Sequence, residues 1–356
     1  MKKFMFLGIV VLMLVSLVLS GCAGQTPSTG PGAQPAKIIN LKFATFIPPM
    51  DTYAEQQGAW AKELETATNG RIKITFYHAE SLVKMPDLFD ATAAGTVDFS
   101  MIDANLRPER LPLSGITTLP MIFKRASQAQ QTMWALLEKY SKFKDEYAPT
   151  KVIWCQNPST AQLYGNKPLQ KLDDLKGQKV AVVTPWEALS LKALGMTPVG
   201  MPPTEMFTAL ERGVVDAASG DFNQAFIWKH FEITKYRTDN VDITSRVSPI
   251  IMNIKTYNNL PDDLKKIFDK TTNGLEMSKR AGLAFEAFMT NSIKMIKEFD
   301  QKKGNPAIYV LPADERQKWL NTVSPVRDQW VAEMEAKGLP GKAMLKDMID
   351  FAEKFK

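Results

Sequence analysis

Apolar residues alternate with polar ones in two short segments near the start of the folded region. Residues 41–46 (LKFATF) and 72–77 (IKITFY) have the period of two and the β-branched and aromatic content of strands. Between them, residues 51–69 carry apolar side chains at helical spacing, and Gly70 follows as a helix stop. The pattern therefore predicts a strand–helix–strand unit.

The same order of elements continues and then returns in the second half of the chain. Residues 86–94 predict a helix that ends at Gly95, and residues 97–102 predict the next strand. The second series comprises a strand at 178–183, a helix at 187–194, an extended piece at 197–200 and a helix at 204–212. Alternating strands and helices are typical of parallel α/β sheets, so we expect two α/β lobes around a cleft.

The C-terminal third of the chain has the pattern of long helices. No proline lies between Pro261 and Asn305, and apolar residues recur there at helical spacing. This predicts one helix of about 65 Å that crosses both lobes, with Gly274 and Gly282 as points where it could bend. We expect two further helices, at 313–336 and 341–355. We expect the first lobe to comprise residues 38–158 and 248–287, and the second lobe residues 159–247 and 288–356.

The first 21 residues have the layout of an export signal. Two lysines precede an apolar run of about 16 residues, which is short for a membrane span. The sequence Leu19-Ser20-Gly21-Cys22 resembles a bacterial lipobox, so we expect cleavage before Cys22 and lipid on its thiol, rather than an ordinary signal peptide or an uncleaved anchor. Residues 23–37 are rich in Gly, Pro, Ser, Thr and Gln, and predict a flexible tether that holds the folded part outside the cytoplasmic membrane, in a periplasm or at the cell exterior.

Charge and motifs argue against catalysis, metal binding and nucleic-acid binding. The formal charge of +6 falls to about +4 once the two signal lysines are removed, and the basic runs lie among acidic neighbours. Cys155 lies in an apolar run, which indicates a buried thiol, and without a second cysteine in the body no disulfide is expected. His78 and His230 lack metal-ligand spacing, and no phosphate loop or nucleophile elbow occurs. We therefore expect no cofactor, no metal and no enzyme activity.

Five blocks of the sequence resemble the solute-binding proteins of tripartite ATP-independent periplasmic (TRAP) transporters, of the dicarboxylate-binding P-subunit type. The blocks are 64–74 (LETATNGRIKI), 88–98 (LFDATAAGTVD), 119–123 (LPMIF), 172–180 (LDDLKGQKV), and 193–199 with 209–216 (ALGMTPV and ALERGVVD). The resemblance implies a two-lobed, periplasmic-binding-protein-like α/β fold with a cleft between the lobes, a long lobe-spanning helix and a helical C-terminus. It also implies that a small organic solute is captured in the cleft and passed to an ion-driven TRAP permease.

The chain departs from this family's pattern where a ligand carboxylate is usually bound. The family usually has an arginine two residues after the second lysine of the fourth block, Lys179, and here that position is Ala181. A second arginine of the family, which aligns near Ala161, is also missing. An arginine binds a carboxylate through two parallel hydrogen bonds. Two hypotheses stay open: the ligand is neutral, aromatic or cationic, or it is an acid held by hydroxyls, amides, backbone N–H groups or another arginine such as Arg107.

Ligands of open α/β lobes bind at the carboxyl ends of strands, and this rule selects the candidate binding residues. They are Phe46, Asp103, Asn105, Gln156, Asn157, Gln162, Tyr164, Ala181, Trp186, Glu187, Asp221, Phe222 and Asn223. Trp186 opens a helix, where its indole either stacks on a planar or cationic ligand or packs the helix start against its lobe. A ligand-sensing lipoprotein that passes its bound form to a receptor would share all of these features.

Overall fold

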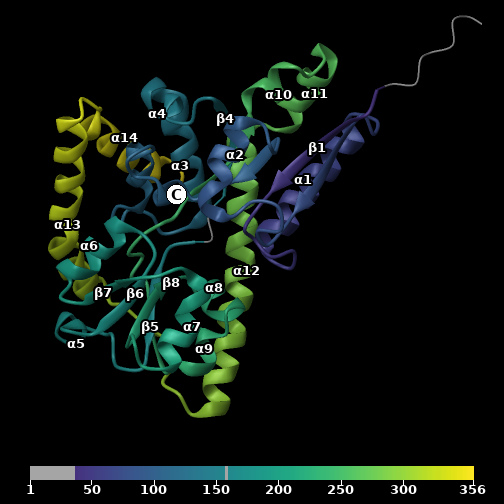
Figure 1. The fold of residues 1–356 in the computed structure, drawn as a ribbon. Helices are drawn as coiled ribbons and strands as arrows, with labels where there is room; N and C mark the ends of the chain where they lie inside the picture. Colours follow the sequence, from purple (N-terminus) through teal and green to yellow (C-terminus); the bar gives the residue numbers. More distant parts are fainter. Residues whose placement is uncertain (1–36, 157–158) are drawn as a thin grey trace, which may run out of the picture. The chain divides into compact units, whose positions relative to one another are not determined.

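The computed structural model describes residues 37–156 and 159–356, and every structural statement below concerns these residues. Residues Ile38–Lys356 form one compact unit (Figure 1). The predictions for the export signal, for lipidation at Cys22 and for Asn157 lie outside the described residues.

The first sheet is mixed and has the order β2-β1-β3-β10-β4. Its strands are β1 (Ile39–Ala44), β2 (Ile72–Tyr77), β3 (Phe99–Met101), β4 (Thr150–Gln156) and β10 (Ser248–Asn253). Strand β1 pairs in parallel with β2 and β3, as the strand–helix–strand pattern predicted, whereas β10 returns from later in the chain and pairs antiparallel with β3 and β4.

The second sheet has the order β11-β9-β5-β8-β6-β7. Its strands are β5 (Gln162–Gly165), β6 (Lys179–Val182), β7 (Thr197–Gly200), β8 (Ala217–Gly220), β9 (Tyr236–Asp239) and β11 (Tyr309–Val310). The parallel strands β7, β6 and β8 carry the second series of predicted elements, and β5 lies antiparallel between β8 and β9. Two α/β sheets are thus present, as the sequence predicted, while the lobe boundaries stay a prediction.

The helices that follow the strands begin and end where their local sequences favour it. In the first half they are α1 (Thr52–Ala67), η1 (Met85–Asp87), α2 (Leu88–Ala94), η2 (Ala104–Leu106), η3 (Pro112–Thr118), α3 (Ala126–Lys139) and α4 (Ser141–Asp145). In the second half they are α5 (Leu172–Leu175), α6 (Pro185–Ala193), α7 (Pro203–Glu211), α8 (Phe222–Ile227), α9 (His230–Ile233) and α10 (Ile254–Asn258). The Asp51 carboxylate caps α1 by accepting a hydrogen bond from Tyr53 N, and Gly95 ends α2 at a φ of 82° that favours glycine.

The predicted continuous helix after Pro261 is wrong, because two helices occupy this segment. Helix α11 (Asp262–Thr271) ends, and Asn273 then caps α12 (Gly274–Lys303) by accepting a hydrogen bond from Glu276 N. An asparagine side chain at this position satisfies a helix N-terminus better than it continues a helix. Helix α12 packs against α3 and β4 of the first sheet's side and also against α8 of the second, so a long helix does bridge the two parts.

The last two helices, α13 (Ala313–Ala336) and α14 (Gly341–Lys354), confirm the predicted helical C-terminus. Helix α13 contacts α6, and α14 contacts both α13 and α3. The apolar stripe of α14, including Met344 and Met348, is buried in the same cluster as Leu136 of α3. No described helix is long and apolar enough to span a membrane.

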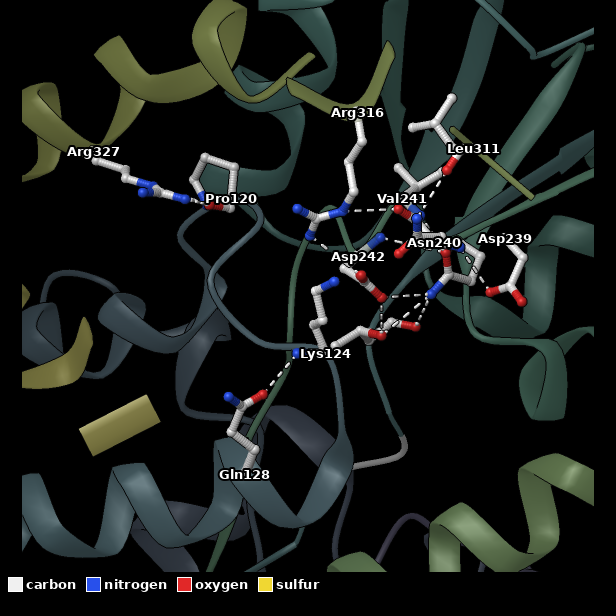
Figure 2. A network of polar contacts seen from close by, with 12 residues as sticks. Pro120, Lys124, Gln128, Asp239, Asn240, Val241, Asp242, Leu311, Arg316 and Arg327 are labelled. Carbon is white, nitrogen blue, oxygen red and sulfur yellow. Dashed lines mark hydrogen bonds and ion pairs between the residues drawn. The ribbon is translucent and has the colours of Figure 1, made fainter. Parts of the chain in front are cut away.

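The segments that connect the two sheets pair with each other. The backbone of Ala161 accepts a hydrogen bond from Ile243 N and donates one to Thr244 O, at 2.9 and 2.8 Å. Two residues of α13 hold neighbouring loops: Arg316 donates to Asn240 O, and Arg327 donates to Pro120 O, each through Nε at 3.0 Å (Figure 2). The described residues of the two connecting segments are therefore hydrogen-bonded to each other and supported by α13.

Candidate functional site

A cavity of about 600 Å³ lies where loops of both sheets come together. Residues after β1, β2 and β3 of the first sheet line it, as do residues after β6, β7 and β8 of the second and the segment that leads into β10. The carboxyl ends of parallel strands thus meet at one solute-sized space, as the topological rule predicted.

Arg246 is the basic residue among the described residues that line the cavity. It lies in the connection between β9 and β10, and its Nη2 donates a 2.8 Å hydrogen bond to Oε1 of Gln224. No carboxylate of the described residues lies within ion-pair distance of its guanidinium. Desolvation opposes its charge, but the negative charges of Glu187, Asp103 and Asp221 outweigh this and raise the pKa of Arg246.

Three aspartates of the cavity lining each cap a helix. Oδ1 of Asp51 accepts from Tyr53 N (3.0 Å), Oδ1 of Asp103 from Asn105 N (3.0 Å), and Oδ1 of Asp221 from Gln224 N (2.8 Å). Each aspartate lies directly before its helix, whose first N–H groups need an acceptor. The strand ends therefore bring carboxylates to the cavity together with the helix starts.

Burial changes the acidity of two of these aspartates. It raises the pKa of Asp51 to about 6, against the hydrogen bond from Tyr53, and the negative charge of Asp221 adds to the increase. Burial also raises the pKa of Asp221, which is opposed by backbone hydrogen bonds and by the positive charge of Arg246. Asp51 and Asp221 thus line the same cavity from loops of the two different sheets.

The rest of the lining is largely apolar and contains several aromatic rings. Phe46 and Tyr53 come from the first sheet's side, Trp228 from the second, and Met85 and Met101 add thioether groups. Tyr53 also packs edge-on against Phe285 of α12, with ring centroids 4.3 Å apart. The cavity thus combines flat apolar surface with a few charged groups, which suits an amphipathic organic solute.

Four of the residues predicted from the sequence line the cavity: Phe46, Asp103, Asp221 and Asn223. Asn105 lies beside them and supports Asp103 by donating its Nδ2–H to Oδ1 at 3.0 Å. Each of these residues follows a strand closely, which is the position that the topological rule selects.

Several other candidates are buried away from the lining. The Gln156 side chain accepts from Gln57 Nε2 (2.9 Å) and so ties β4 to α1. Gln162 is the first residue of β5, where its Oε1 accepts from Val241 N at 2.9 Å and its Nε2 donates to Asp242 Oδ1 at 2.9 Å. Tyr164 contacts Nδ1 of the buried His230 through its hydroxyl, at 3.0 Å.

The candidate residues on or near β6 and β8 are buried by packing within the protein. Ala181 and Phe222 are buried in one apolar cluster. The indole of Trp186 lies against Gly115 of η3 and belongs to another cluster, and it is not among the residues that line the cavity. Glu187 is fully buried: Oε1 accepts from Ser219 Oγ (2.6 Å) and Oε2 from Val183 N (3.1 Å), so it acts on Arg246 only through its charge.

Sequence reasoning missed Arg246, Asp51, Tyr53, Gln224 and Trp228. Arg107, the arginine that it named as a substitute, donates instead to Pro86 O and to Asp90 Oδ2, both at 2.7 Å. One signal did exist for Arg246, because it is the single charged residue in the otherwise apolar and small-polar stretch 243–254. A charge in such a stretch indicates a site where it meets a partner.

An α/β scaffold whose strand ends converge from two sheets on one solute-sized cavity defines a small-molecule binding protein. The chain belongs to family 7 of the bacterial extracellular solute-binding proteins, the DctP family, whose model matches residues 43–334. It is a TRAP solute-binding protein of the DctP type, which confirms the resemblance read from the five blocks. The family consists of transport binding proteins and is not an enzyme family.

Known relatives share the whole length of the fold. The uncharacterized protein YiiZ of Salmonella typhimurium is 23% identical over 333 residues, covering 92% of this chain and 94% of YiiZ. A TRAP solute-binding protein from Rhodoferax ferrireducens, solved with copurified benzoate, is 26% identical with a TM-score of 0.81, covering 89% of this chain and 98% of its own. A marine-metagenome TRAP protein specific for aromatic acid ligands, solved with metahydroxyphenylacetate, is 25% identical with a TM-score of 0.81, covering 89% and 99%.

Proposed function

We propose that this protein captures a small organic acid in the cavity, that Arg246 binds the acid's carboxylate, and that the loaded protein delivers it to a TRAP permease. The observation that carries the proposal is the guanidinium of Arg246, which reaches a largely buried, solute-sized space and has one hydrogen bond to Gln224 and no carboxylate of the described residues at ion-pair distance. A ligand carboxylate would supply the missing charge partner through charge-assisted hydrogen bonds.

This proposal favours one of the two ligand hypotheses that the sequence left open. In this proposal Arg246 takes the role of the arginine absent at Ala181, so the ligand is an acid held by an arginine other than Arg107. The aromatic side chains Phe46, Tyr53 and Trp228 favour a planar acid, in line with the benzoate and metahydroxyphenylacetate bound by two relatives.

Titration calorimetry with benzoate as the probe tests the proposal. Arg246→Gln should weaken benzoate binding about 10- to 100-fold, because a charge-assisted hydrogen bond is replaced by a weaker neutral one. Arg107→Gln is the matched control and should bind benzoate as the wild type does. If neither benzoate nor metahydroxyphenylacetate binds, or if Arg246→Gln binds them unchanged, the proposal is wrong.

We further propose that the cavity closes on its ligand and that lipid on Cys22 holds the protein at the membrane. Closure should reduce the radius of gyration in small-angle scattering at saturating benzoate, whereas an unchanged profile would exclude it. Cys22→Ala should move the exported protein into the soluble fraction. A variant that stays with carbonate-washed membranes would indicate an uncleaved anchor instead.

If the protein is instead a ligand-sensing lipoprotein, its closed, ligand-bound form should bind a receptor rather than a TRAP permease. Deletion of the TRAP permease genes should abolish uptake of the bound acid if the protein serves transport. Uptake that is unaffected, together with loss of a transcriptional response to the acid when this chain is deleted, would support a receptor partner.

A further inference from the structure

The charges that line the cavity do not balance. Asp51, Asp103 and Asp221 share the cavity lining with one guanidinium, that of Arg246, among the described residues. The fourth acidic residue there, Glu80, is already engaged, because its Oε2 lies 3.3 Å from Lys84 Nζ and its Oε1 accepts from Met85 N at 2.9 Å. A ligand that brought only a carboxylate would neutralise Arg246 and leave the three aspartates without a cation.

Helix capping explains why the aspartates are present but uses only part of each carboxylate. The hydrogen bonds within the described part of the chain reach Oδ1 of Asp51 and Oδ1 of Asp103, and leave Oδ2 of both for another donor. An asparagine or serine would cap these helices about as well without bringing a charge into a largely buried space. The capping role alone therefore does not account for three acids at one cavity.

The aspartates also come from both sides of the cavity. Asp51 and Asp103 belong to loops of the first sheet, and Asp221 to the loop after β8 of the second. Like charges that approach from two sides repel each other when the cavity closes, unless a cation lies between them. A ligand cation at this position would remove the repulsion and would add charge-assisted hydrogen bonds to both sides.

We propose that the physiological ligand carries a protonated amine as well as a carboxylate, so that Arg246 binds the carboxylate and Asp51, Asp103 and Asp221 bind the ammonium group. This proposal rests on the proposed function, because it takes the cavity and the role of Arg246 as its frame. It places the ligand among amino-substituted, ring-bearing organic acids rather than among plain aromatic acids or dicarboxylates. A dicarboxylate is the least favoured, since its second carboxylate would lie beside the aspartates.

Two probes of nearly equal size test this assignment. 3-Methylbenzoate and 3-(aminomethyl)benzoate share the ring and the carboxylate and differ by an ammonium group at neutral pH. The wild-type protein should prefer the amino probe by at least about 10-fold in calorimetry, as expected for one charge-assisted hydrogen bond in a desolvated site. Asp103→Asn and Asp221→Asn keep a capping side chain, and each should reduce this preference several-fold.

The preference is a ratio within one variant, so a general loss of stability or of cavity shape affects both probes alike. Asp262→Asn, at the exposed start of α11, is the control and should keep the wild-type ratio. A wild-type protein that binds 3-methylbenzoate as tightly as the amino probe, or Asp→Asn variants in the cavity that keep the full preference, would overturn the inference. If 3-methylbenzoate binds in an Arg246-dependent way but the amine adds nothing, this inference alone fails; if neither probe depends on Arg246, the proposed function fails.

Discussion

The side-chain oxygen of Gln224 accepts a 2.8 Å hydrogen bond from Nη2 of Arg246. The same Gln224 is held from behind, because its Nε2 donates to the Tyr164 hydroxyl (3.4 Å), which in turn contacts Nδ1 of His230 at 3.0 Å. Gln224 therefore acts as a positioning residue that fixes one edge of the guanidinium and leaves the rest for a ligand.

Gln224→Glu should weaken the binding of benzoate by about 10-fold or more. The new carboxylate would pair with Arg246 at hydrogen-bond distance and compete with the ligand's carboxylate for the same charge. Calorimetry measures the effect, and Gln301→Glu on the exposed end of α12 is the control for added negative charge. Unchanged benzoate affinity in Gln224→Glu would show that Gln224 does not hold the guanidinium in the binding conformation.

A second prediction concerns the buried ion pair that joins β9 to α12. Nη1 of Arg237 lies 2.7 Å from Oδ1 of Asp300, and its Nη2 donates to Phe231 O (2.6 Å) and Thr234 O (3.0 Å). Asp300→Asn would leave a buried guanidinium without its counter-charge, so we expect a loss of about 3–5 kcal/mol in the free energy of unfolding.

Urea denaturation measures this loss, with the exposed pair of Lys346 and Asp350 as the comparison. Asp350→Asn should change the free energy of unfolding by less than about 1 kcal/mol, because solvent screens an exposed pair. Equal effects of the two substitutions would contradict the role given to Arg237 and Asp300.

Replacing two glycines inside helices with alanine should have opposite effects on the free energy of unfolding. A Cβ at Gly282 of α12 would lie 2.2 Å from Cα of Ser127, so helices α12 and α3 approach each other closely there, whereas a Cβ at Gly58 of α1 would meet nothing within 4 Å. Gly282→Ala should destabilise the protein by about 1–3 kcal/mol through overpacking. Gly58→Ala should stabilise it by about 0.5–1 kcal/mol through helix propensity. Thermal or urea unfolding of both variants checks the sign, and a neutral Gly282→Ala would contradict the close helix contact.

Strand bounds and helix caps, which depend on residues close together in the sequence, could be predicted closely. The observed bounds of β2 match the alternating segment 72–77, and the cap residue Asp51 immediately precedes α1. The parallel pairing of β1 with β2 and β3 also agrees with the predicted α/β pattern. The break at Asn273 was missed because helical spacing of apolar residues continues across it, while a single capping side chain ends the helix.

The candidate site could be predicted only in part, because half of it comes from distant segments. Asp103 and Asp221 closely follow their strands, so the sequence places them at the cavity, whereas Asp51 lies seven residues beyond β1. Arg246 reaches the cavity from the connection between β9 and β10, a segment that pairs with the distant residue 161. Gln162 and Tyr164 lie within β5, where side chains face the sheet's own neighbours rather than the strand ends.

The last prediction concerns Glu146, a buried carboxyl group near the start of η3. It accepts from Leu113 N (2.7 Å) and from Ser114 Oγ (3.3 Å), yet burial outweighs these hydrogen bonds and raises its pKa to about 7. Because the folded state holds this proton up to a higher pH than the unfolded state does, the contribution of Glu146 to stability falls as pH rises from about 4.5 to about 7.

Glu146→Gln keeps an acceptor for Leu113 N and removes the charge. Its free energy of unfolding should therefore match that of the wild type near pH 4 and exceed it by up to about 3 kcal/mol at pH 8. Urea unfolding at pH 4, 6 and 8 measures the difference, with Glu211→Gln on the exposed end of α7 as a control that should show none of this trend. A difference between Glu146→Gln and the wild type that stays constant over this pH range would mean that the carboxyl group is ionised throughout, and that the hydrogen bonds from residues 113 and 114 compensate for its burial.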